Sequence, residues 1–271
     1  MKNFISSEIE SLPPLPQTII ELQRICANED TTIKQVSSVI EKDPFLTADL
    51  IKCANSPLYG CRRSVDSVFL AVSMFGIGTA KGLAIASAVK SNFIIDLSPY
   101  NLSTHKFTEI SNLKSAFIMQ WLNDKKQLHS TLIPCALLMY LGMAIIADCL
   151  RKRGEVSDFL KNFDKENQLD SEKQLLNCTH LDVLKSLFKY WNFDEKITKV
   201  VESLAQNDIN NDLEIYTAPL LVLNKLITPF SSASLEQIKD SINLVESYNL
   251  DKDSFINTLK NMQLYKEGLE S

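Results

Sequence analysis

The spacing of apolar and polar positions is helical along almost the whole chain. Apolar residues recur every three or four positions, and polar residues fill the opposite faces of the predicted helices. No alternating pattern longer than four residues, which would indicate a strand, occurs. The predicted helices cover 16–27, 33–40, 44–55, 67–75, 79–92, 108–123, 130–151, 155–163, 171–177, 180–190, 195–206, 213–227, 235–248 and 252–265. The pattern therefore predicts an all-α protein.

One of these helices is marked at both ends. Asp43 followed by Pro44 predicts a helix start, because the Asp side chain accepts from first-turn N–H groups and proline has no N–H to leave unpaired. Pro57 disfavours the helical conformation at Ser56, so the helix should end near Asn55. Both boundaries of this helix are therefore predicted from local chemistry.

The helical spacing is interrupted once over a longer stretch. Residues 93–103 lose the helical period, and Pro99 lies within them. We therefore expect two parts that together form one unit: a helical bundle over 1–98 and a larger helical part over 99–271.

Composition and charge narrow the classes of protein. Apolar residues make up 45% and charged residues 23%, which is typical of globular proteins, and only 7 of 271 residues are glycine, which favours long helices with short connections. The net charge of −5 argues against a general nucleic-acid-binding surface. The six cysteines form no C-x-x-C pair, and the first residues do not resemble a secretory signal. We expect reduced thiols and a cytoplasmic location.

The most apolar stretch raises the question of membrane insertion. The 21 residues between Lys126 and Asp148 carry no charge, a length that could cross a bilayer. The stretch begins with polar residues, contains Pro134 and lacks interfacial aromatic anchors. We expect a central core helix and no membrane insertion.

The string DPFLTADLIKCANSPLYG at 43–60 resembles the signature of the HDOD family, the HD-related output domains of bacterial signalling proteins. The opening LPPLP at 12–16 is similar to the start of that family, and the resemblance extends over about 10–205. It implies that a helical bundle packs on a degenerate, helical relative of the HD phosphohydrolase domain. The signature positions are Asp43, Pro44, Asn55, Ser56, Tyr59 and Gly60.

The residues that hold metal in HD phosphohydrolases are missing from this chain. Those enzymes use a His, an adjacent His-Asp pair and a later Asp to bind one or two metal ions. The resemblance places the pair at Met139-Tyr140 and the first His near Ser111, and none of the three histidines of the chain precedes an Asp. The vestigial positions of the site are Ser111, Met139, Tyr140 and His180. We expect no catalytic residues, no metal and no other cofactor.

These features favour a non-catalytic signal-transduction module that binds signalling proteins, at grooves between helices or at the vestigial site. Two alternatives stay open. One is a divergent metal-dependent phosphohydrolase that uses His105, His129 or His180 with nearby carboxylates. The other is a sensor that binds a small regulatory nucleotide without catalysis.

Two local features have more than one interpretation. Asn55 either ties the following loop to its helix or contacts a ligand or partner. The segment GIGTAKG at 76–82 is either a turn between two helices or an anion site at a helix N-terminus. Its spacing matches neither G-x-G-x-x-G nor G-x-x-x-x-G-K, and no strand precedes it.

Overall fold

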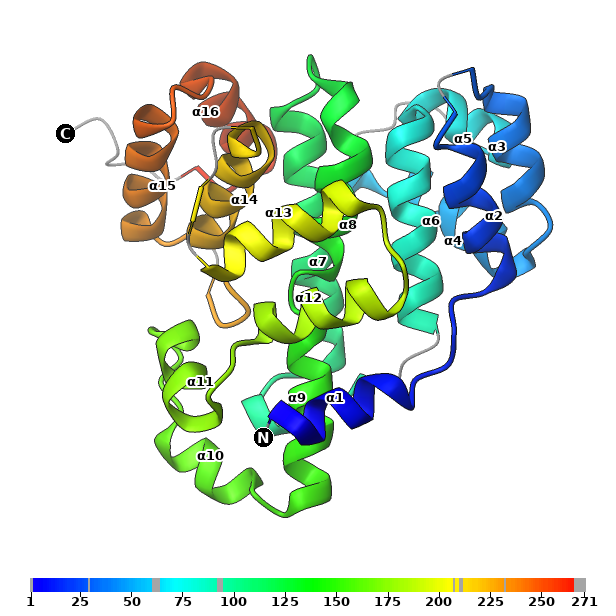
Figure 1. Cartoon of the computed structure of the whole chain (residues 1–271). Coiled ribbons are helices and arrows are strands. Elements are labelled where there is room, and N and C mark those ends of the chain that lie inside the picture. Colours follow the sequence, from blue (N-terminus) through cyan, green and yellow to red (C-terminus); the bar gives the residue numbers. More distant parts are fainter. Residues whose placement is uncertain are drawn as a thin grey trace.

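The computed structural model describes residues 2–28, 30–59, 64–91, 95–206, 208–209, 212–231 and 233–265. These residues form α-helices and short 3₁₀ turns, and no strand occurs among them (Figure 1). The predicted all-α fold is confirmed. The first six helices are α1 (Lys2–Glu10), α2 (Gln17–Ile25), α3 (Ile33–Ile40), α4 (Pro44–Ala54), α5 (Val68–Phe75) and α6 (Ile77–Ser91).

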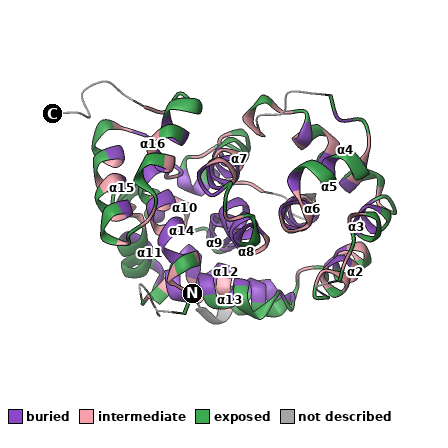
Figure 2. Cartoon of the chain, turned by 90° about the horizontal axis from the view of Figure 1, so that it is seen from above, coloured by how far each residue is buried: buried purple, intermediate pink, exposed green. Residues whose placement is uncertain are grey.

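The helices after residue 98 surround a central pair. They are α7 (Thr104–Trp121), α8 (His129–Leu138), α9 (Leu141–Arg153), α10 (Val156–Asn162), α11 (Gln168–Leu176), α12 (His180–Tyr190), α13 (Glu195–Gln206), α14 (Glu214–Leu226), α15 (Leu235–Ser247) and α16 (Lys252–Asn261). Helix α8 packs against α6 on one side and α7 on the other, and α9 packs against α12. Figure 2 shows buried residues concentrated on α8 and α9 at the centre.

The predicted single helix over 130–151 is wrong in one respect. The chain forms two helices, because helical hydrogen bonding is interrupted at Met139-Tyr140, between Leu138 and Leu141. Apolar spacing continues through the break, so the sequence pattern alone could not reveal it. The break lies at the position where the resemblance placed the His-Asp pair.

Helix α1 is an addition to the predicted set. Its Ile5 and Ile9 are each 4% exposed, and the helix packs against α9 and α12 (Figure 1). A nine-residue helix is marginal on its own in water, so these tertiary contacts stabilise it. The N-terminal segment therefore contacts the part of the molecule that follows residue 98.

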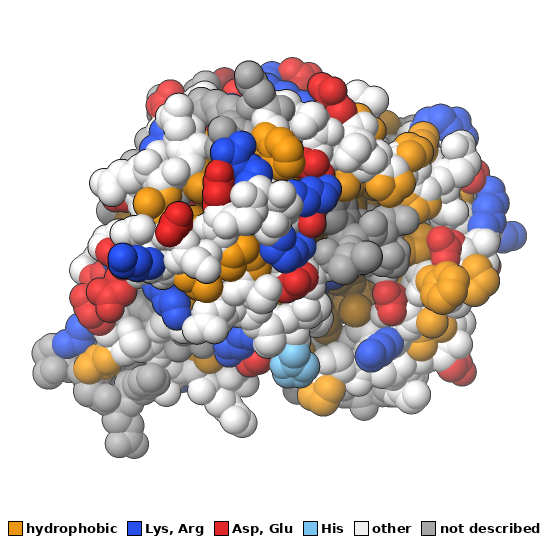
Figure 3. All heavy atoms as spheres, turned by 90° about the horizontal axis from the view of Figure 1, so that it is seen from below, with side chains coloured by type: hydrophobic (Ala, Val, Ile, Leu, Met, Phe, Trp, Pro, Cys, Tyr) orange, Lys and Arg blue, Asp and Glu red, His pale blue; other side chains and the backbone are white. Residues whose placement is uncertain are grey.

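The apolar stretch that could cross a membrane by length lies in the core. Of the helices in the described residues, the run Lys126–Arg153, which contains α8 and α9, meets the length and composition of a span, and 94% of its most apolar window is buried inside the molecule. Such burial is that of a core helix. On the face seen in Figure 3, basic and acidic side chains are interspersed, in keeping with the small net charge.

His129 joins α8 to the two helices beside it. Its Nδ1 lies 3.0 Å from Thr79 Oγ1, and its Nε2 lies 3.1 Å from the carbonyl oxygen of Leu122. Because a carbonyl only accepts, Nε2 carries the proton and Nδ1 accepts from the threonine hydroxyl. Burial lowers the pKa of His129 below its ordinary value.

This histidine predicts a loss of stability in acid. Below the ordinary histidine pKa of about 6.5, the unfolded chain binds a proton that the folded chain resists, so the free energy of unfolding falls as the pH drops. Chemical denaturation between neutral and mildly acidic pH should show a weaker pH dependence for His129→Gln than for the wild type. His105→Gln, at an exposed position, should retain the wild-type pH dependence. Equal pH dependence in all three proteins would contradict this prediction.

Candidate functional site

The signature helix α4 is fixed at its start and tied to the loop after its end. Asp43 Oδ1 accepts from the N–H groups of Phe45 at 2.9 Å and Leu46 at 3.1 Å. Asn55 Nδ2 donates to the carbonyl of Val65 at 2.6 Å, and its Oδ1 accepts from the Val65 N–H at 2.9 Å. All polar atoms of the Asn55 side chain are thereby used within the chain, which is the stitching role considered for this residue.

The other signature residues extend these contacts toward the second part of the molecule. Ser56 Oγ accepts from the N–H of Leu58 at 3.4 Å. Tyr59 Oη lies 2.7 Å from Ser115 Oγ on α7, and the Tyr59 ring meets Phe75 edge-on. Burial raises the pKa of the Tyr59 phenol. The described signature residues thus cap the start of α4, tie the following loop to its end and pack this region against α7.

The signature position Gly60 lies outside the described residues.

The second group of predicted positions lies at the break between α8 and α9, and a lysine occupies its centre. Lys114 of α7 is 0% exposed, and its Nζ donates to Tyr140 Oη and to Asn224 Oδ1, both at 2.6 Å. The same Nζ lies 4.1 Å from the centroid of the Tyr140 ring. Tyr140 Oη donates in turn to the carbonyl of Ile227 at 3.1 Å. We call Lys114, Tyr140 and Asn224 the lysine cluster.

The lysine cluster contains no carboxylate partner for the amine. Burial lowers the pKa of Lys114 well below its ordinary value and raises that of the Tyr140 phenol. Met139 completes the cluster's surroundings, since its sulfur lies 3.7 Å from Asn224 Nδ2. Ser111, one helical turn before Lys114, is 1% exposed, and its hydroxyl has no hydrogen-bond partner in the described structure.

His180, the last of the predicted site positions, is hydrogen-bonded to a buried carboxylate. Glu172 is 0% exposed, and its Oε2 accepts from the His180 N–H at 2.7 Å and from Nδ1 at 2.8 Å. Its Oε1 accepts from Tyr100 Oη at 3.0 Å and from Gln168 Nε2 at 3.2 Å. The carboxylate of Glu172 thus contacts both the backbone and the ring of His180.

The lysine cluster and the Glu172–His180 pair meet at one cleft. The cleft has a volume of about 680 Å³ and lies between the start of α11 and α12 on one side and α14 and α15 on the other. Tyr140, His180 and Asn224 line it, whereas Lys114 and Ser111 lie behind this lining. The structure thus brings Met139, Tyr140, His180 and Ser111 into one region. Its rim carries the charged residues Lys165, Glu166, Asp170, Lys225, Glu236 and Asp240.

The sequence analysis missed Lys114 and Asn224. A signal existed for the lysine, because Lys114 continues the apolar stripe of Ile110, Phe117 and Trp121 on the buried face of α7. A charged residue in such a stripe indicates a buried polar site. For Asn224, 110 residues away from Lys114, no local pattern indicates the contact.

Comparison with known proteins places this architecture among solved structures. A family model described as HDOD domain matches residues 12–206. A virulence factor from Campylobacter jejuni subsp. jejuni is 28% identical, with a TM-score of 0.61, over 98% of this chain and 97% of that one. A candidate signal transduction protein from Marinobacter aquaeolei VT8 is 18% identical, with a TM-score of 0.67, over 97% of this chain and 63% of that one.

Two further matches complete this picture. A candidate phosphohydrolase from Shewanella amazonensis SB2B is 19% identical, with a TM-score of 0.65, over 96% of each chain. An uncharacterized protein of Treponema pallidum is 30% identical over 73 residues, which are 27% of this chain and 14% of that protein. This chain therefore matches a small fraction of the length of that curated relative, while its fold matches several solved structures over nearly its whole length.

Proposed function

The chain belongs to the HDOD domain family, and from that membership we propose that it is a non-catalytic signal-transduction module that acts by binding another protein. The observation that carries the proposal is the lysine cluster, which stands where the resemblance to HD phosphohydrolases expects metal ligands. A solved structure with the same fold is described as a candidate signal transduction protein, which agrees with this assignment.

The chemistry of the lysine cluster does not fit a divalent metal ion. The Lys114 amine donates to a phenol and to a side-chain amide, and the lysine cluster contains no carboxylate or imidazole. Hard divalent ions require carboxylates or neutral imidazoles that converge on one point. Among the described residues, no group of three or more His, Cys, Asp or Glu side chains is placed to hold a metal ion. The lysine cluster is therefore a poor site for a divalent metal ion.

An exposed apolar helix face supports the binding part of the proposal. On α5, Phe69 and Leu70 are 49% and 46% exposed, although the helix is only eight residues long and packs its other face against α3, α4 and α6. Large apolar side chains gathered on one short helix favour contact with another protein.

Affinity capture with matched variants tests this proposal. A tagged protein should capture a specific partner from extract of its own cells, and the double variant Phe69→Ser, Leu70→Ser should lower the captured amount at least about tenfold, as expected for the loss of two interface anchors. The control is Leu160→Ser, Leu175→Ser, which changes two side chains of similar exposure on α10 and α11. Circular dichroism should show that both variants remain folded. Absence of a specific partner, or equal capture by both variants, would count against the proposal.

The Glu172–His180 pair at the cleft favours one competing function, a divergent hydrolase. We expect the purified protein to contain no stoichiometric Mn, Fe or Zn and to show no turnover of a phosphodiester substrate. Stoichiometric metal together with turnover that His180→Ala abolishes would overturn the non-catalytic assignment. For the nucleotide-sensor alternative, cyclic dinucleotides and guanosine tetraphosphate should leave the melting temperature unchanged.

A further inference from the structure

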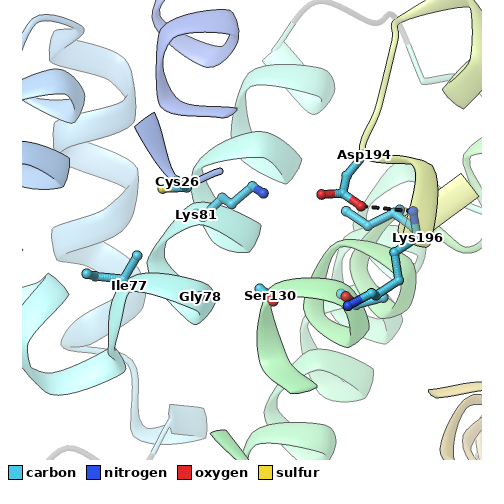
Figure 4. Close-up of a pocket in the computed structure, with 9 residues that line it drawn as sticks. Cys26, Ile77, Gly78, Lys81, Ser130, Asp194 and Lys196 are labelled. Carbon is cyan, nitrogen blue, oxygen red and sulfur yellow. Dashed lines mark hydrogen bonds between the residues drawn. The ribbon is translucent and has the colours of Figure 1, made fainter. Parts of the chain in front are cut away.

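A second, smaller cavity lies away from the cleft, where α6 meets α8 and the connection between α12 and α13. Its volume is about 130 Å³. Figure 4 shows the start of α6 on one side and Asp194, with the first turn of α13, on the other. The cavity is lined by Cys26, Ile77, Gly78, Lys81, Ser130, Thr131, Asp194, Lys196 and Ile197. It includes part of the GIGTAKG segment, to which the signature and the lysine cluster give no role.

A lysine whose side chain is largely buried directs its amine into this cavity. Lys81 is 7% exposed, and it makes no hydrogen bond or ion pair with any residue that the structure describes. In Figure 4 its amine extends across the cavity toward one carboxylate oxygen of Asp194, but the two groups do not form an ion pair. The buried aliphatic stem of Lys81 thus delivers an amine with free donors to the cavity.

Further donors belong to residues that line the same cavity. Helix α6 begins with Ile77 and Gly78 at the cavity, and Gly76 before it has no side chain to cap the free N–H groups of the first turn. A helix N-terminus carries partial positive charge and binds anions. The hydroxyls of Ser130 and Thr131 also line the cavity, and neither has a hydrogen-bond partner in the described part of the chain.

Close packing brings these donors together. A Cβ added to Gly78 would lie 3.1 Å from both Cβ and N of Ser130, so the glycine allows the start of α6 to approach the start of α8. The donors of the cavity therefore come from separate helices, and the direct contact between α6 and α8 fixes their relative positions.

We propose that this cavity binds inorganic phosphate. Lys81, the N-terminus of α6 and the two hydroxyls would surround the negatively charged oxygens. Asp194 already accepts from the Lys196 N–H at 2.9 Å through Oδ1, and its other oxygen is positioned to accept from a P–OH group. Phosphate retains a proton at neutral pH, whereas sulfate has none to donate, so the aspartate should select phosphate over sulfate.

The size of the cavity limits the ligand. The cavity of about 130 Å³ has room for a small ion. Because α6 lies before residue 98 and both α8 and α13 lie after it, a bound phosphate would bridge helices from both ends of the chain. The phosphate proposal uses different residues from the partner-binding proposal, so the failure of one would leave the other unaffected.

Equilibrium dialysis and isothermal titration with inorganic phosphate at fixed ionic strength test the site. The wild type should bind one phosphate, and Lys81→Met should bind it at least tenfold more weakly. Asp194→Asn should lose the preference for phosphate over sulfate, because an amide N–H can donate to either ion. Lys199→Met is the control, since it removes one positive charge from an exposed ion pair on α13 without touching the cavity, and it should bind as the wild type does.

Several outcomes would overturn the proposal. They are equal phosphate affinity in the wild type and Lys81→Met, equal affinity of the wild type for sulfate and phosphate, or no binding at all. If Lys81→Met does not fold, Ser130→Ala decides, with a few-fold weaker affinity expected and unchanged affinity contradicting the site. A phosphate monoester tests the role of Asp194 separately. In its dianionic form, at mildly alkaline pH, the monoester has no P–OH group and should bind more weakly than inorganic phosphate. Equal or tighter binding of the monoester would contradict the role of Asp194.

Discussion

Replacing Gly142 with alanine should destabilise the protein by about 3–5 kcal/mol, the range of severe core substitutions. Gly142 lies in the first turn of α9, directly after the break at Met139-Tyr140. A Cβ at this position would lie 2.0 Å from the carbonyl oxygen of His180 and 2.8 Å from its carbonyl carbon. The obstacle is backbone, and Glu172 holds the same residue through its N–H and its ring. Neither side can therefore yield without breaking buried contacts.

The measurement is the free energy of unfolding in urea, with Gly154→Ala as the matched control. Gly154 ends α9 with φ of +70°, and a Cβ there meets nothing within 4 Å. Its substitution should therefore cost only the strain of a left-handed residue, about 1–2 kcal/mol. If Gly142→Ala lowers the free energy of unfolding no more than Gly154→Ala does, the backbone of α9 does not approach that of α12 as closely as described.

The features predicted correctly from the sequence are those decided within one or two helical turns. Asp43 caps α4 through the N–H groups of Phe45 and Leu46, as predicted, and the helix ends at Ala54, shortly before Pro57. In each case the cap and its target are at most three residues apart, so local chemistry determines the result.

The features that sequence analysis missed depend on residues far apart in the chain. Lys114 meets Tyr140 and Asn224 across 26 and 110 residues, and the tight contact of Gly142 is with His180. The break between α8 and α9 occurs within an unbroken apolar pattern. The family resemblance pointed to Met139-Tyr140, where the helix breaks, but it did not indicate Lys114, which comes from a different helix and is placed beside Tyr140 by tertiary packing.

Replacing Lys114 with methionine should raise the free energy of unfolding at pH 7 by about 1–4 kcal/mol, the range for whole buried charged clusters replaced by apolar side chains of similar volume, less the cost of leaving Asn224 Oδ1 without this donor. The wild type buries the amine completely without a carboxylate beside it, and that burial lowers its pKa well below the ordinary value. Methionine fills similar space and needs no proton or partner. Tyr140 keeps its hydrogen bond to the carbonyl of Ile227 in the variant, which limits the loss.

The pH dependence distinguishes this explanation from simple repacking. In the unfolded chain, lysine titrates near its ordinary pKa of about 10.4, so at neutral pH unfolding is accompanied by proton uptake. The contribution of Lys114 to stability should therefore rise as the pH increases toward 10, so the advantage of Lys114→Met over the wild type should shrink over the same range. Lys106→Met, at a side chain 41% exposed on the same helix, should follow the wild type at every pH. If the lysine cluster instead stabilised a charged ammonium, Lys114→Met would be less stable than the wild type at pH 7. The stability difference between the two proteins would then not show the predicted decrease of a variant advantage with rising pH. A more stable Lys114→Met variant would show that the lysine cluster is maintained in this chain at a cost to folding, which is the expected signature of a functional position.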